Sequence, residues 1–557
     1  MSLHRVSSIA SYEQIRNASP ARSEHTKLSF NPAGSKLMPP DFKDEAIGAF
    51  EVSKPRRILQ VLTAVIYCLF AAGVVFGYAA IKPVLVKEGV YSEFCPEVQE
   101  EAHNGAGGGT CFEQEIRLNF MFTTAAVATN VCALPVGAVL DRYGPRVCGV
   151  IGSMLLAVGS LLLAFAAQAS FDAYIPGYLF LALGGPFVFI SSFQLSNTFP
   201  QHSGLILALL TGAFDSSSAI FLFYRLIYTA SDDQFTLYKF FLIYLIVPVF
   251  ILIAQLTIMP SRSYETAGEL INQAKAVDSG DLDGRADIRG RQERYERRES
   301  AVSELTSLLG KGGDKQQEQE RKKQQISGVW GALHGRSALQ QIRTPWFILV
   351  ASFTVVQMTR INYFVATIYT QYQYLLGDDH SAEVVNHFFD VALPVGGLCA
   401  IPFIGIILDN TSTAFCLGVL VTVATAIGVL GLLPYMWAAY ANIILFVLYR
   451  PLYYTAVSDY ASKVFGFQTF GKVYGLVICL AGLLNFSQSA LDAATHKGFK
   501  HDPLPVNIIL LVIALVVGVA LVSYVWYKSR YMHREELEEE AEDATETPMP
   551  GADVDSD

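Results

Sequence analysis

The feature that most constrains this chain is a series of long apolar runs. A helical span of a bilayer needs roughly 20 apolar residues, and we count twelve such runs in the sequence. They cover about residues 58–80, 117–140, 146–168, 173–195, 203–229, 236–259, 345–372, 383–408, 413–433, 437–459, 470–492 and 504–527. Because open strand edges leave backbone groups unpaired in lipid, all twelve must be helices. The sequence therefore predicts an all-α membrane protein with two halves of six helices.

Composition and charge agree with this prediction and orient the chain. Charged residues make up 16% of the chain, against roughly 25% in soluble domains. Lys and Arg residues gather at span ends on one predicted side, which marks that side as cytosolic. They are Lys54, Arg56, Arg57, Arg142, Arg146, Arg262, Arg343, Lys463, Lys472, Lys528, Arg530 and Arg534. We therefore expect both termini in the cytosol, as a disordered tail at 1–57 and an acidic, solvated tail at 528–557.

The loop after the first span, about residues 83–116, is predicted to lie outside the cytosol. It contains Cys95 and Cys111, whereas the other six cysteines fall in or beside predicted spans. An oxidising compartment permits a disulfide between these two, and two free thiols are the alternative. The remaining cysteines lack metal-ligand spacing, so we predict neither a metal site nor a cofactor.

Residues 260–344 separate the two predicted halves, 58–259 and 345–527. This segment has 15 Lys and Arg against 13 Asp and Glu. Such a nearly balanced charge argues against nucleic-acid binding, which needs a strong basic excess. We expect a solvated cytosolic linker, with cytosolic proteins as candidate partners.

A short motif joins the second and third spans. Its residues are Gly137, Asp141, Arg142, Gly144 and Arg146, and a shorter copy, Gly405 to Asp409, ends the eighth span. Glycine lets helices approach closely, and a charged side chain stabilises a neighbouring helix end. The motif resembles the loop between helices 2 and 3 of the major facilitator superfamily. That resemblance implies two six-helix repeats that alternate access around a midplane substrate site.

Longer phrases resemble one branch of this superfamily, the sodium-independent facilitators of large neutral amino acids and their fungal relatives. The phrases include Glu88-Gly-Val-Tyr91-Ser, Arg117-Leu-Asn-Phe-Met-Phe-Thr, Ser192-Phe-Gln194-Leu-Ser-Asn197 and Gln357-Met-Thr-Arg360-Ile-Asn. The resemblance implies a cytosolic latch in which Asp141 lies near the amino end of span 11 and Gly137 permits the close approach. Because the second copy lacks the following Arg, we expect Asp409 to form a weaker latch.

In the facilitator fold, helices 1, 4, 7 and 10 line the central cavity. Arg360 and Arg450 lie near the middle of spans 7 and 10, where an unpaired charge is costly. A guanidinium can bind a substrate carboxylate with two parallel hydrogen bonds. The alternative is pairing with an internal acid, for which Asp215 and Asp390 are available.

Six further side chains or small residues are candidates for the substrate site. Instead of binding substrate, the hydroxyl and amide groups among them can form hydrogen bonds between helices. The candidates are Gly73 in span 1, Ser191, Ser192 and Gln194 in span 4, and Tyr363 and Tyr454 in spans 7 and 10.

The sequence favours facilitated diffusion over proton coupling. Spans 1 and 4 contain no Asp or Glu. His387 and Asp390 lie three residues apart on span 8 and, with Asp215, are the candidates for a proton relay. A structural pair at the outer end of span 8 is the alternative.

We predict a transporter rather than an enzyme, since no catalytic constellation stands out in the sequence. The predicted substrates are large, apolar neutral amino acids, moved by sodium-independent uniport. One alternative is proton-coupled transport of another carboxylate or small organic solute. The other is a non-transporting amino-acid sensor. The topology fits both the plasma membrane and the vacuolar membrane.

Overall fold

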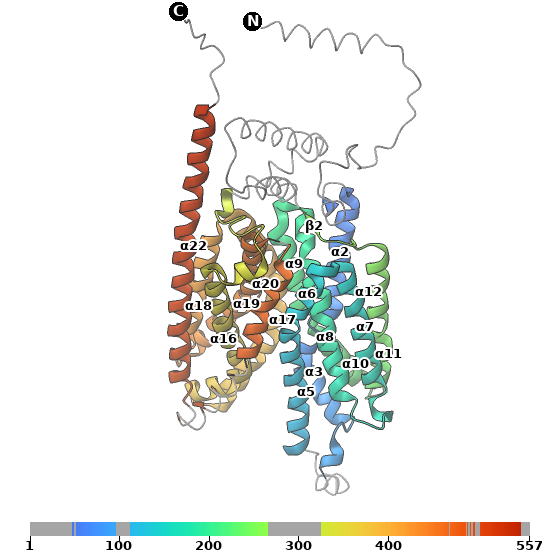
Figure 1. Cartoon of the computed structure of the whole chain (residues 1–557). Coiled ribbons are helices and arrows are strands. Elements are labelled where there is room, and N and C mark those ends of the chain that lie inside the picture. Colours follow the sequence, from blue (N-terminus) through green and yellow to red (C-terminus); the bar gives the residue numbers. More distant parts are fainter. Residues whose placement is uncertain are drawn as a thin grey trace, which may run out of the picture. The chain divides into compact units, whose positions relative to one another are not determined.

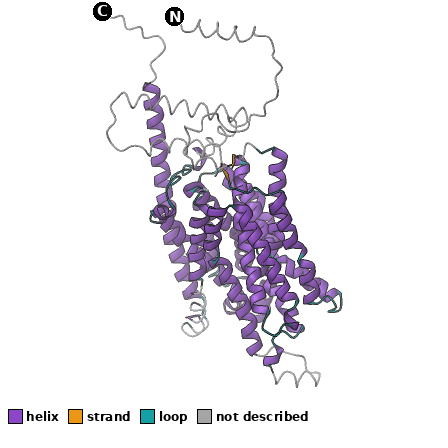
Figure 2. Cartoon of the chain, turned by 45° about the vertical axis from the view of Figure 1, so that its right-hand side comes forward, coloured by secondary structure: helices purple, strands orange, loops and turns teal. Residues whose placement is uncertain are grey.

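The computed structural model describes a helical protein. Its described residues are 47–48, 52–95, 112–265, 325–466, 468–485, 487, 491, 494–495, 499 and 502–546. Figure 2 shows helices throughout, with one small pair of strands. In that pair, β1 (Ile47–Gly48) lies parallel to β2 (Tyr264–Glu265). The prediction of an all-α fold is confirmed.

The first half consists of helices that are often broken within a span. Gly73 lies at one such break, where the first span changes from an α-helix to a 3-10 turn. The elements are α2 (Lys54–Ala71), η3 (Val74–Gly77), α3 (Tyr78–Lys87), η4 (Ser92–Phe94), α5 (Phe112–Val131), α6 (Ala133–Tyr143), α7 (Pro145–Ala164), η5 (Ala166–Gln168), α8 (Tyr174–Ser192), η6 (Phe193–Thr198), η7 (Pro200–His202), α9 (Ser203–Ser217), α10 (Ala219–Ala230), α11 (Leu237–Tyr244) and α12 (Ile246–Thr257).

The second half has longer, mostly continuous helices. They are α15 (Ala338–Ile342), α16 (Pro345–Leu376), α17 (Asp379–Asn410), α18 (Thr413–Leu430), α19 (Met436–Phe465), α20 (Phe470–Leu484) and α22 (Leu504–Glu546). Pro345 occupies the first turn of α16, and Gly377 ends it in a left-handed conformation, as proline and glycine favour. The last helix continues well past residue 527, because the charged residues that end an apolar span do not end a helix.

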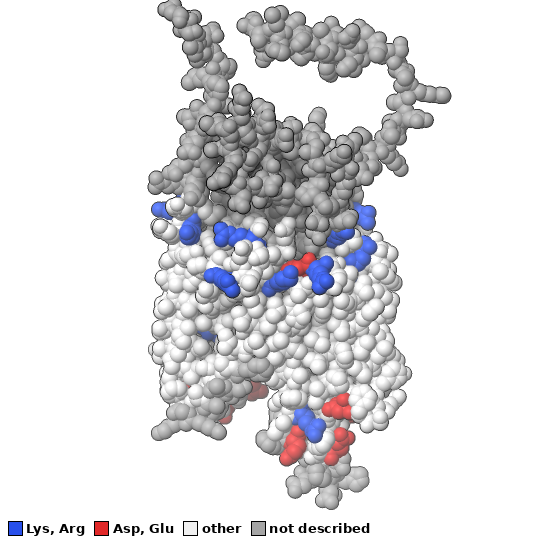
Figure 3. Space-filling model, in the orientation of Figure 1, with Lys and Arg blue, Asp and Glu red and all other residues white. Residues whose placement is uncertain are grey.

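The outer surface suits a bilayer. Among the described residues, nine helices are long and apolar enough to cross a membrane, and a tenth is the pair Asp379–Gly397 and Cys399–Asn410, bent by 49°. Large side chains such as Phe223, Ile246 and Phe403 are exposed. Figure 3 shows a broad uncharged belt below a band of Lys and Arg. The predicted number of twelve spans is compatible with these helices and stays a prediction.

Two sets of helix contacts hold the halves together. Figure 1 shows α16 to α22 grouped apart from the helices of the first half. Between the groups, α6 packs against α20, and α9 packs against α17 and α19. The second and eighth predicted spans thus occupy matching places in the two halves, as the internal repeat predicts.

The end of the predicted linker is packed rather than solvated. Residues 327–344, which we call the docked segment, lie against the end of α19. The Gly331 and Leu333 N–H groups donate to the carbonyls of Lys463 and Val464 at 2.9 and 3.0 Å. Gln341 is fully buried and donates to the Phe465 carbonyl at 3.0 Å. This part of 260–344 therefore belongs structurally to the second half, whereas 266–324 lies outside the described residues.

Candidate functional site

The first contact between the halves is a helix cap made by a carboxylate. Asp141, near the end of α6, accepts hydrogen bonds from the N–H groups of Gly471 and Lys472 at 2.9 and 3.0 Å. These N–H groups belong to the second and third residues of α20, in the first turn, whose N–H groups have no partner within the helix and where the helix dipole favours an anion. Gly137 lies one turn earlier on the same face, so its backbone touches that of Gly471. The four-residue spacing of Gly and Asp therefore provides both the close approach and the cap.

The arginines of this motif act within the first half. Gly144 has φ of 82° and ends α6, and Pro145 begins α7 directly after it. Arg146 donates to the Met259 carbonyl at 2.8 Å, beyond the end of α12. The Arg142 guanidinium lies 5.4 Å from the ring centre of Tyr143. Arg146 thus holds the motif to the sixth span.

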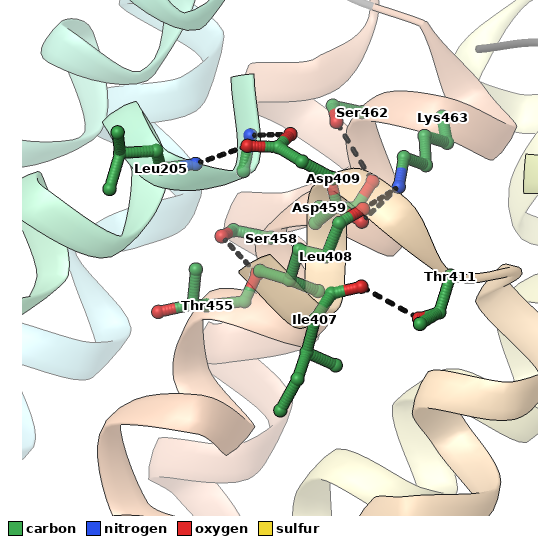
Figure 4. Close-up of polar contacts among 11 residues, drawn as sticks. Leu205, Ile407, Leu408, Asp409, Thr411, Thr455, Ser458, Asp459, Ser462 and Lys463 are labelled. Carbon is green, nitrogen blue, oxygen red and sulfur yellow. Dashed lines mark hydrogen bonds and ion pairs between the residues drawn. The ribbon is translucent and has the colours of Figure 1, made fainter. Parts of the chain in front are cut away.

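The second contact between the halves is also a helix cap, but here the carboxylate belongs to the second half and the capped helix to the first. Asp409, near the end of α17, accepts from the N–H groups of Gly204 and Leu205 at 2.9 and 3.1 Å, at the start of α9 (Figure 4). A Cβ on Gly405 would lie 2.9 Å from Leu205. Although this copy lacks the following Arg, its carboxylate makes the same pair of bonds as Asp141. Each half therefore caps one helix of the other.

A buried ion pair lies beside the second cap. Lys463 Nζ is 2.6 Å from Asp459 Oδ2 (Figure 4), and both side chains are almost fully buried. The same ammonium donates to the Leu408 carbonyl at 3.4 Å. The predicted spans place Lys463 in the connection between residues 459 and 470, whereas α19 continues to Phe465 and buries the Lys463 side chain. The spacing of four residues between Asp459 and Lys463 is the signal that sequence reasoning missed.

Arg450 pairs with an acid rather than standing free. Its Nη2 atom on α19 lies 3.6 Å from Oδ1 of Asp215 on α9, so the ion pair joins the halves. Its guanidinium carbon lies 5.9 Å from the ring centre of Tyr454. Of the two interpretations of Arg450, the structure therefore shows pairing with an internal acid.

Arg360 points into the second half. Its Nη2 donates to the Ala424 carbonyl of α18 at 3.1 Å, and its Nη1 donates weakly to Gln357 Oε1 at 3.4 Å. Arg360 and Tyr363 line a cavity whose wall residues all belong to the second half. The predicted position of Arg360 on the central cavity between the halves thus differs from its observed place, because the side chain leaves α16 toward α18.

The predicted residues of spans 1 and 4 bond to neighbouring groups in the bundle. The Gly73 N–H donates to Ser217 Oγ at 2.7 Å, so Gly73 packs against α9 rather than leaving room for a ligand. The Ser192 and Tyr67 hydroxyls are 2.9 Å apart. Gln194 Oε1 accepts from the Tyr264 N–H at 2.9 Å, and Ser191 donates to the Val188 carbonyl at 3.1 Å.

The candidates for proton coupling have different surroundings where the structure describes them. Asp215 pairs with Arg450, His387 is exposed on α17, and the Asp390 side chain lies outside the described residues.

The outcome for the cysteines concerns Cys95. It forms a disulfide, while its predicted partner Cys111 lies outside the described residues. Within the described part of the chain, no group of His, Cys, Asp and Glu could hold a metal ion.

Comparison with known proteins agrees with this geometry. The model of the Major Facilitator Superfamily matches residues 110–487. The chain belongs to this superfamily. A facilitator with several apolar spans is an integral, multi-pass membrane transporter, and the predicted family is confirmed.

The names of three relatives give different substrates or none. Protein FMP42 of Saccharomyces cerevisiae is 47% identical over 84% of this chain and 94% of its own length. The equilibrative nucleobase transporter 1 of Bos taurus is 25% identical over 83% and 95%. The human large neutral amino acids transporter small subunit 3 is 24% identical over 86% and 95%.

A solved facilitator shares the fold. The proton:xylose symporter XylE, bound to 6-bromo-6-deoxy-D-glucose, superposes with a TM-score of 0.52 at 15% identity, covering 86% of this chain and 96% of XylE. At this identity the likeness shows the fold alone.

Proposed function

We propose that this facilitator transports large neutral amino acids by alternating access, without sodium or proton coupling. The observation that carries the transport mechanism is the reciprocal capping by Asp141 and Asp409. Both caps lie at the same end of the bundle and consist of bonds that can break together when the halves separate. The amino-acid substrate rests on the branch resemblance and on the human relative named above.

The moving bodies in this proposal are the halves 58–259 and 345–527. The capped end carries the band of Lys and Arg (Figure 3), and this positive charge supports a cytosolic location for that end. The tails 1–57 and 528–557 and the linker 260–344 would then be cytosolic. The plasma membrane and the vacuolar membrane both suit this orientation.

A second candidate substrate is a nucleobase. The bovine nucleobase transporter aligns over almost the same share of the chain as the human amino-acid transporter and at similar identity. Both functions fit the same fold and the same two caps. Uptake measurements with both classes of substrate distinguish the two functions.

The deciding experiment is uptake into proteoliposomes that contain the purified full-length protein. We would offer labelled leucine, phenylalanine and adenine, in sodium-free buffer, with and without an imposed pH gradient. We expect saturable uptake of leucine and phenylalanine that does not depend on the gradient. Uptake of adenine alone would replace the proposed substrate, and uptake only with the gradient would replace uniport by proton coupling.

A further inference from the structure

A small polar cavity lies inside the second half. Its walls come from α16, α18, α19 and α22, and its volume is about 50 Å³, enough for a few water-sized groups. The polar residues that line it include Arg360, Asn442 and Tyr449. Gln371 and Asn507, hydrogen-bonded at 3.0 Å, continue the polar lining toward the end opposite the capping carboxylates. The cavity is therefore too small for a transported organic solute but large enough for a small ion.

The charge of Arg360 is not neutralised within the described residues. A guanidinium has five N–H groups, and that of Arg360 donates there to the Ala424 carbonyl at 3.1 Å and to Gln357 Oε1 at 3.4 Å, neither of which is charged. Arg450 differs, because it has Asp215 at 3.6 Å. A cation in a membrane-spanning bundle is costly without an anion. Arg360 therefore attracts a negative ion and has further N–H groups to donate to it.

Two buried side chains in the same walls add hydrogen-bond donors. Tyr449 is 3% exposed, and its hydroxyl has no partner among the described residues. Asn442 is 1% exposed and donates from Nδ2 to the Tyr372 hydroxyl at 2.9 Å, while its Oδ1 has no partner there. Because a tyrosine hydroxyl both accepts and donates, half a turn of the amide keeps this bond and places Nδ2 where Oδ1 lies. An anion would then receive hydrogen bonds from both side chains, which are costly to leave unpaired.

Two glycines at the end of α18 set the spacing of these groups. A Cβ on Gly428 would lie 2.8 Å from Arg360 Nη2, and a Cβ on Gly431 would lie 3.2 Å from Asn442 Nδ2. Residues three apart on a helix face have Cβ positions about 5–6 Å apart. The guanidinium and the amide are therefore about one helical turn apart, a separation that a single ion hydrogen-bonded to both can bridge.

We propose that this cavity binds one small inorganic anion of the size of chloride. The Arg360 guanidinium holds the ion, and the Tyr449 hydroxyl and the turned Asn442 amide are its further donors. A monatomic anion suits this site because it accepts hydrogen bonds from any direction and needs little space. The ion neutralises Arg360 and links α16 to α19, so it stabilises the second half. It is not the transported solute, and it stays within that half when the halves move.

The test is chloride binding to the full-length protein in nanodiscs of neutral lipid. Binding is measured with radiolabelled chloride and, separately, through the midpoint of thermal unfolding. Gluconate replaces chloride at constant ionic strength and pH, because gluconate is too large for the cavity. We expect a single saturable chloride site and a midpoint that rises by about 2 °C or more at saturating chloride. Bromide, a slightly larger monatomic anion, should replace chloride in both measurements.

Single substitutions locate the ion in this cavity. Tyr449→Phe removes one donor and keeps the ring, and Gly428→Ala places a methyl group against the guanidinium and keeps its charge. Gly418→Ala, on the same helix as Gly428, meets nothing within 4 Å and is the matched control. We expect chloride binding about tenfold weaker in Tyr449→Phe and in Gly428→Ala, the effect of losing one hydrogen bond to a charged group. Binding in Gly418→Ala should be unchanged.

Removing the charge tests its role directly. In Arg360→Gln the midpoint of thermal unfolding should no longer respond to chloride. If folded wild-type protein shows no saturable chloride binding, or if Tyr449→Phe and Gly428→Ala both bind chloride as tightly as wild type, the anion site is overturned. Neither result bears on the proposed function, which is decided by uptake of leucine.

Discussion

At the scale of single residues, two carboxylates link the halves by capping helices. Asp141 and Asp409 each accept two backbone N–H groups at the start of a helix in the opposite half. A side-chain cap stabilises a helix by about 1 kcal/mol, and a favourable charge at the dipole adds up to about 1 kcal/mol at an exposed site. Caps of this size can stabilise one state and still be broken during each transport cycle.

Replacing either carboxylate by an amide should slow turnover. In Asp141→Asn the side chain loses its charge and one of its two acceptors, so the capped state loses about 1–2 kcal/mol, a factor of about 5 to 30 in its population. We expect a lower maximal uptake rate with little change in half-saturation, and a similar effect for Asp409→Asn. Initial rates in proteoliposomes measure this, and unchanged turnover in both variants would remove the caps from the mechanism.

The ion pair between Arg450 and Asp215 should matter mainly for stability. Asp215→Asn leaves a buried guanidinium unpaired, at a cost on the order of 3 kcal/mol, whereas Asp215→Asn with Arg450→Gln removes both charges. We expect the midpoint of thermal unfolding to fall most in the single variants Asp215→Asn and Arg450→Gln, and to recover partly in the double variant. If the loss in the double variant equals the sum of the losses in the two single variants, the side chains do not interact.

At the scale of helices, close packing of backbones decides whether the halves can close. A Cβ on Gly137 would overlap the Gly471 backbone, so Gly137→Ala should force α6 and α20 apart. We expect at least a tenfold loss of uptake rate with the protein still folded. Gly418→Ala is again the control, because the added methyl group meets no atom within 4 Å. Uptake at the wild-type rate in Gly137→Ala would mean that this approach is not needed for transport.

The docked segment should detach as the pH falls. Burial lowers the pKa of His334 to about 4, although hydrogen bonds to the backbone of Ser462 and Lys463 oppose the shift. When the segment is detached, His334 takes up a proton near pH 6.5, so docking is favoured above that pH and weakens between about 6.5 and 4. Hydrogen exchange of 327–344, corrected for intrinsic rates, should show this. His334→Gln should abolish the pH dependence of docking. If the variant keeps the same pH dependence, a group other than His334 is responsible for it.

Sequence reasoning was most successful for helix positions and less so for side-chain directions. Long apolar runs indicate where helices lie, and the spacing from Gly137 to Asp141 indicates which face meets α20. The direction of Arg360 depends on which neighbouring helix offers space, here at Gly428 of α18. That information is not in the local sequence of α16. The burial of Lys463 escaped prediction for a similar reason, because a charge near a span end is usually solvated.

At the scale of the whole molecule, the proposed mechanism makes this structure one of the two states of an alternating cycle. Both caps are formed at the end that carries the band of Lys and Arg, and Figure 3 shows a hollow between the halves at the opposite end. In the proposed mechanism, this arrangement is that of a transporter closed at the capped end. The account therefore predicts a second state in which both caps are broken and the hollow is closed.

The most direct test is the distance between the halves at the capped end. Spin labels would be attached through the substitutions Val147→Cys and Phe415→Cys, at exposed positions of α7 and α18, in a background from which the exposed Cys399 has been removed. We predict one short-distance population without substrate and a second, longer one with saturating leucine. An unchanged distance distribution, in protein that takes up leucine, would contradict the alternating movement of the halves.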